Sequence, residues 1–147
     1  MNGLSNPVET ESELLGLLRD WQAKEKDSIA MARETQRRSR NAVVRLVMEI
    51  IAHDAVLHHR VEQFLLDSIE KSTTMAQPDE VDIVWSMIAQ HNELEKSVLE
   101  LAQRAQKLPA GTTMPDFLID YLVEDERKHD ALLERLEEIK IKLHPSV

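Results

Sequence analysis

The residues best suited to chemistry are Glu126 and His129, which form a Glu-x-x-His pair near the C-terminal end of the chain. Residues three apart share one face of a helix, and this face also carries Leu122 and Leu133. A carboxylate and an imidazole therefore fall where packing favours apolar side chains, and burying them costs free energy unless they bind each other or a ligand. In four-helix bundles that hold two metals, such pairs supply ligands from two of the four helices.

Polar residues also interrupt the other apolar stripes that the sequence predicts. Each of the four predicted helices places a carboxylate or an imidazole near its middle. Oxygen and nitrogen ligands of this kind suit iron, manganese or zinc, and the lack of cysteine disfavours copper(I) and iron-sulfur clusters. The predicted metal ligands are Glu25, His58, Glu95, Glu126 and His129, with Asp54, Glu62 and His91 nearby as further candidates.

Composition predicts the helices that would position these residues. A chain of 147 residues with 42% hydrophobic content suits one domain with a single core. The chain has three glycines, five prolines and 3% aromatic residues, which is little for a sheet protein. Sheets usually need glycine and proline in their turns and aromatic residues in their strands. Long helices are the natural alternative, so we expect an all-α fold.

Charge and hydropathy limit the partners. A formal net charge of −9 makes a nucleic-acid backbone an unfavourable partner, and the arginines at 33–45 are interpreted as a solvated helix turn. No apolar run approaches the roughly 20 residues that span a bilayer, and residues 1–10 lack the pattern of a signal peptide. We therefore expect a cytoplasmic protein with no membrane and no nucleic-acid partner.

Local signals divide the chain into four helices. Thr10 and Glu13 form a capping box, which predicts a flexible leader at residues 1–10 and a first helix to about residue 36. Breaks are predicted at 38–41, at 72–79, which contains Pro78, and at 108–113. Residues 11–144 are predicted to form one bundle domain, built from two similar helix pairs at about 11–72 and 79–144.

The two halves match at an offset of about 70 residues. Glu25 then corresponds to Glu95, and His58 corresponds to His129 at an offset of 71. Two helix pairs of one design are implied, and they can close an antiparallel four-helix bundle.

With these residues the chain resembles the ferritin-like superfamily, in particular its rubrerythrin-like and uncharacterised bundle members. The resemblance covers roughly residues 12–142 and rests on Glu25, the run 54–58, Glu95 and the run 125–129. It implies two irons that oxidise ferrous iron, reduce peroxide or activate oxygen. It also implies that Glu25 and Glu95 are terminal ligands, that Glu126 bridges, and that His58 and His129 supply nitrogen.

The chain departs from that pattern at Ala55, where the family has its second bridging glutamate. Asp54 lies about 100° around the helix and does not replace it without distortion, whereas Glu62, one turn beyond His58, could reach inward. A mononuclear site, an altered two-metal site and a vestigial site without metal are all consistent with the sequence. The last of these would make the protein a non-catalytic bundle that acts as an interaction or oligomerisation module.

A second resemblance, to haemerythrin-type cation-binding bundles, rests on His58-His59 followed by Glu62 and on His91. That family spreads histidines over all four helices, whereas the first helix here has none. The connection between the second and third helices separates the two topologies, because ferritin-like bundles cross over there and haemerythrin-type bundles turn back. Helix 2 is apolar over much of its circumference, so we also expect a homodimer.

Overall fold

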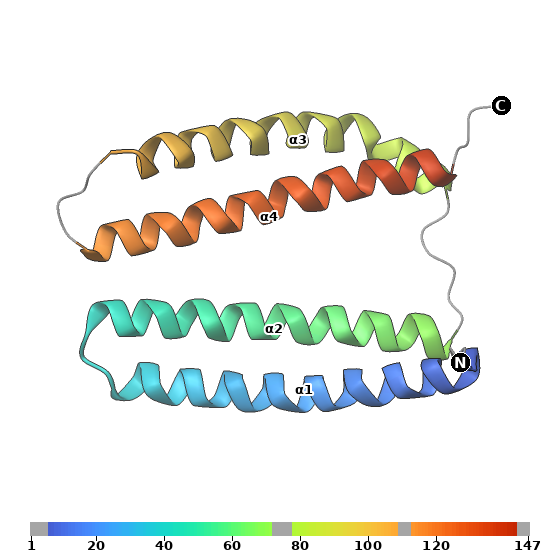
Figure 1. The fold of residues 1–147 in the computed structure, drawn as a ribbon, viewed down its shortest axis with the longest axis horizontal. Coiled ribbons are helices and arrows are strands. Elements are labelled where there is room, and N and C mark those ends of the chain that lie inside the picture. Colours follow the sequence, from blue (N-terminus) through green and yellow to red (C-terminus); the bar gives the residue numbers. More distant parts are fainter. Residues whose placement is uncertain (1–5, 72–77, 109–112, 144–147) are drawn as a thin grey trace, which may run out of the picture. The chain divides into compact units, whose positions relative to one another are not determined.

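A computed structural model describes residues 6–71, 78–108 and 113–143, and its elements are four α-helices (Figure 1). They are α1 (Pro7–Arg38), α2 (Ala42–Glu70), α3 (Pro78–Gln106) and α4 (Thr113–Leu143). The three described segments contain no strand, which confirms the all-α prediction. Within them, no helix combines the length and the apolar character that crossing a membrane requires.

The chain divides into two compact units, Met1–Met75 and Ala76–Val147. Each unit is a helical hairpin, in which α1 packs against α2 or α3 packs against α4. The two helices of each hairpin run antiparallel and side by side (Figure 1). The hairpin is therefore the unit that positions the side chains of any site, and the single bundle domain at 11–144 stays a prediction.

The first helix begins earlier than the capping box at Thr10 predicts. Asn6 caps it, since its side chain accepts a hydrogen bond from the Val8 backbone nitrogen at 3.3 Å, and Pro7 follows in the first turn. Asparagine is a strong N-cap, and proline fits the first helical position because it has no N–H to leave unpaired. The predicted leader at 1–10 is thus wrong for residues 7–10, which are helical, and residues 1–5 lie outside the described residues.

A tight turn joins α1 to α2. Asn41 caps α2, because its Oδ1 accepts hydrogen bonds from the backbone nitrogens of Val43 at 2.9 Å and Val44 at 3.1 Å. The guanidinium of Arg45 donates to the backbone carbonyls of Gln36 and Ser39, which lie at the C-terminal end of α1. The turn therefore provides partners for several of the backbone groups that the two helix ends leave open.

The interface of the first hairpin has a heptad pattern. Its buried positions in α1 follow one another at intervals of seven, and those in α2 at intervals of three, seven and four. This spacing keeps one stripe of each helix facing the other. The buried residues of this interface are Leu18, Glu25, Ala32, Ala52, Ala55, Glu62 and Leu66. Two of these seven are glutamates, which packing alone does not explain.

Replacing Asn41 by alanine tests the role of the cap. Asn41→Ala leaves the first backbone N–H groups of α2 without their acceptor, and we expect it to lower the free energy of unfolding by about 1 kcal/mol. Urea denaturation followed by circular dichroism measures this change. Asn41→Ser keeps an acceptor at the cap and should restore most of the loss; equal destabilisation by both substitutions would contradict this role.

Candidate metal centre

Three predicted ligands come together in the second hairpin. Glu95 of α3 and Glu126 and His129 of α4 each offer a ligand atom, and these atoms lie within 4.8 Å of one another. The Nδ1 atom of His129 is 3.3 Å from Glu126 Oε2 and 3.5 Å from Glu95 Oε2. The Glu-x-x-His spacing on α4 and the antiparallel packing of α3 thus place two carboxylates around one imidazole.

Neighbouring groups hold this cluster in place. His91 lies one turn before Glu95, and its Nε2 is 2.9 Å from Glu95 Oε1. Asp125 Oδ2 is 3.7 Å from the Nε2 atom of His129. Burial raises the pKa of Glu95, but hydrogen bonds with His91 and Glu126 and the nearby imidazoles outweigh it, so this pKa is lowered below 4.5. The carboxylate is therefore kept in its charged form, the form that binds a cation.

The first hairpin brings together the other two predicted ligands, Glu25 and His58. The Nδ1 atom of His58 is 3.3 Å from Glu25 Oε1, and the same oxygen accepts a hydrogen bond from Trp21 Nε1 at 3.0 Å. The indole orients the carboxylate, a role that the sequence did not reveal because apolar spacing alone predicts Trp21 to be a packing residue. The five predicted ligands are thus divided between the two hairpins.

Glu62 is the most deeply buried acidic side chain of the first hairpin, with 3% of its surface exposed. Neither of its carboxylate oxygens has a hydrogen-bond partner among the described residues. Burial raises the pKa of Glu62 above its ordinary value of 4.5, and the Glu25 carboxylate adds to the rise, while His59 and His58 oppose it. A buried carboxylate without a donor is costly, which makes Glu62 the least explained residue of this interface.

The inner face of α2 differs from the stripe that the sequence predicts. The sequence predicts a stripe through Ala55, His58 and Leu65, but the side chain of His58 is 55% exposed and Leu65 is exposed as well. Ala55 is buried as that stripe predicts, and Glu62, seven residues further along, is buried although it lies outside the stripe. Because α2 carries apolar residues around much of its circumference, hydrophobic spacing does not determine which side faces α1.

Two further candidates lie at the edge of their interfaces. Asp54 is partly exposed and, with Glu25, Ala55 and His58, lines an open hollow of about 290 Å³. The side chain of His91 is 57% exposed, so this residue is a partner of Glu95 at the surface rather than a core histidine. Neither Asp54 nor His91 belongs to the close cluster around His129.

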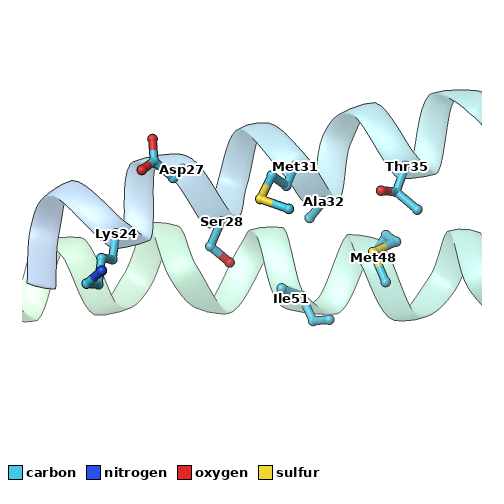
Figure 2. Close-up of a pocket in the computed structure, with 8 residues that line it drawn as sticks. All are labelled: Lys24, Asp27, Ser28, Met31, Ala32, Thr35, Met48 and Ile51. Atoms are coloured by element: carbon cyan, nitrogen blue, oxygen red, sulfur yellow. The ribbon is translucent and has the colours of Figure 1, made fainter.

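A neighbouring hollow of about 520 Å³ between α1 and α2 shares Ser28 and Ile51 with the one beside Ala55. Figure 2 shows Met31 and Ala32 on α1 and Met48 on α2 among the residues that line it. The lining also includes Lys24 and Asp27, and in the described residues it holds no group of three close ligand atoms. Glu25, His58 and Glu62 do not line this hollow.

Comparisons of the chain with protein-family models, with curated proteins and with solved structures gave no match. The resemblance to the ferritin-like superfamily accordingly stays a prediction from the sequence. The placement of the side chains carries the functional argument.

Glu62→Met should stabilise the metal-free protein. Methionine has a similar volume and needs no hydrogen bond, so we expect about 1–3 kcal/mol of added stability at neutral pH. The pKa of Glu62 is raised in the folded state, so its ionised form costs stability above that pKa, whereas well below 4.5 the residue is protonated in both states. The gain should therefore shrink as the pH falls.

Denaturant unfolding in the presence of a chelator, at pH 7.5 and at pH 4, measures this gain. Glu49→Met is the matched control, since Glu49 lies on the same helix with an exposed side chain. A Glu62→Met variant that is less stable than the natural chain at pH 7.5 would show that the carboxylate stabilises the hairpin.

Proposed function

We propose that this chain is a metal-binding helical protein whose ion is held by Glu95, Glu126 and His129. The close approach of their ligand atoms, within 4.8 Å, is the observation that carries the proposal. Two carboxylates and one imidazole form a donor set that suits iron, manganese or zinc. The side chains of Glu95 and Glu126 are 15% and 20% exposed, so a cation would replace the water that burial has removed from them.

The arrangement supports a role in iron handling or redox chemistry. Three protein ligands leave coordination positions open for water, oxygen or peroxide, as catalytic metal sites do. The His129 side chain is 41% exposed, which gives small molecules a route to the cluster. Bound iron would supply the redox chemistry, while the two carboxylates hold the ion and neutralise its charge.

We further propose that the two hairpins assemble into an antiparallel four-helix bundle, as the repeated sequence pattern predicts. Residues 71–77 connect α2 to α3, and eight extended steps reach about 29 Å at most. A helix of the length of α2, 29 residues, extends about 43 Å. This length favours a simple up-and-down connection over the crossover of ferritin-like bundles. The prediction that Glu25 and His58 complete the same centre depends on this assembly.

The alternative function is a helical module that binds no metal and acts through its surface. Ala55 is the observation that favours it, because it is buried in the first hairpin where the family resemblance implies a ligand. A bundle of this kind would meet its partners, or a second copy in the expected homodimer, through exposed apolar residues such as Leu57, Phe64 and Phe117. A cytoplasmic location is part of either proposal.

Substitution of Glu126 tests the metal centre. Glu126→Gln keeps the size of the side chain and removes the anionic ligand, so we expect divalent cobalt or zinc to bind about tenfold more weakly or worse. Isothermal titration measures the affinity. Glu124→Gln is the matched control, because Glu124 lies two residues away and pairs with Arg127 on the exposed side of α4. Equal affinity in the two variants would rule out Glu126 as a ligand.

Addition of ferrous iron in air separates the metal-binding function from the surface module. If the cluster binds iron, the protein should gain near-ultraviolet absorption faster than the same buffer without protein, and the Glu126→Gln variant should lose the increase. Metal analysis of protein purified without chelator gives a second measurement. Substoichiometric metal together with an unchanged spectrum would favour the module.

A further inference from the structure

Glu62 points to a second ligand site, within the first hairpin. Its side chain is 97% buried, with both oxygens lacking a hydrogen-bond donor in the part of the chain that the structure describes. A carboxylate in such a place is compensated by a proton or by a bound cation. We propose that Glu62, Glu25 and His58 bind a divalent transition-metal ion, separately from the Glu95, Glu126 and His129 cluster.

The other two ligands already lie together on the same interface. Glu25 is buried in the same interface as Glu62. Its Oε1 atom accepts a hydrogen bond from Trp21 Nε1 and lies 3.3 Å from His58 Nδ1. The Oε2 atom takes part in neither of these contacts. A cation between the two helices would therefore meet one carboxylate from α1, and one carboxylate and one imidazole from α2.

Charge favours a cation over a neutral ligand at this place. The groups whose charges act on Glu62 are Glu25, His59 and His58 among the described residues, with no lysine or arginine. Arg19, two residues before Trp21, is instead paired with Glu70 near the end of the hairpin. A divalent ion would balance the two carboxylates, and the nitrogen donor selects zinc, iron or manganese over calcium or magnesium.

The two hairpins differ in where α2 and α4 place their second carboxylate. At an offset of 71 residues, Ala55 corresponds to Glu126, and Glu62 corresponds to Leu133. Positions 55 and 62 are seven residues apart, so they lie on one face of α2 about 10.5 Å apart along its axis. The carboxylate of the first hairpin therefore follows its histidine, whereas that of the second precedes it. In the described residues, the ligand atoms of Glu25, His58 and Glu62 do not form a group within 4.8 Å of one another, so closing this set on one ion requires the side chains to turn toward it.

Metal stoichiometry on the full, untagged chain tests the second site. Equilibrium dialysis with cobalt chloride should give two ions per chain for the natural protein. The Glu62→Gln variant should keep the ion of the second hairpin and bind the ion of the first hairpin at least tenfold more weakly. The Glu126→Gln variant should keep the ion of the first hairpin. Glu49→Gln, an exposed glutamate on the same helix, should still bind two. Circular dichroism establishes that each variant is folded.

Other outcomes decide between the two proposals. Unchanged cobalt binding in Glu62→Gln would overturn the second site, and so would a single ion that only Glu126→Gln removes. If both variants lose every ion, the site at Glu62 is not separate from the Glu95, Glu126 and His129 cluster, and the proposal of a second site is wrong. If Glu62→Gln loses an ion while Glu126→Gln still binds two, the second site stands and the proposed function at Glu126 fails.

Discussion

The cost of removing carboxylates from water is the constraint on which the rest of this structure depends. Each hairpin is closed by a heptad interface, and each interface contains a glutamate from both of its helices. Glu95 offsets this cost through the contact of its Oε1 atom with His91, although its Oε2 atom has no hydrogen-bond partner among the described residues, and Glu25 offsets it with an indole and an imidazole. Glu62 has no such compensation among the described residues, so the balance of the first hairpin differs from that of the second.

The sequence repeat explains why both hairpins place a glutamate at the same position along their first helix. At an offset of 70 residues, Leu18 corresponds to Ile88, and Glu25 corresponds to Glu95. Each of these residues is buried or partly buried within its own hairpin. The first helices of the two hairpins thus share one inward pattern, while their second helices diverge at the positions of Ala55 and Glu62. A glutamate can thus move from one buried position of a helix to another seven residues away. This changes the groups that a hairpin offers to a ligand and keeps the heptad spacing of its interface.

Much of this could be predicted from the sequence. The break at residues 38–41 located the turn between α1 and α2, because such signals act over a few residues. The break predicted at 72–79 was wrong for Pro78 and Asp79, since α3 begins at Pro78, which fits the first helical position. The Glu126-x-x-His129 spacing correctly placed a carboxylate and an imidazole together, and Glu25 with His58 followed from the repeat. These features are local or periodic, so they need no knowledge of the packing partner.

Other features escaped the sequence. Asn6, and not Thr10, caps the first helix, and Pro7 after it fits the first turn of a helix. The inward rotation of α2, which buries Glu62 and exposes His58, is set by contact with α1 and not by hydrophobic spacing. The hydrogen bond from Trp21 to Glu25 likewise depends on how the indole settles beside the interface.

Leucine at the matching position of α4 shows that the packing spacing there requires no charged residue. In α4 the residue that corresponds to Glu62 is Leu133, which is partly buried and needs no hydrogen bond. A leucine at position 62 would satisfy the heptad spacing of α2 and would avoid the desolvation of a charge. The chain places a glutamate there instead, beside a second buried carboxylate, which raises the cost further. That choice is consistent with an interface arranged to hold a cation, because a bound cation converts the cost into binding energy.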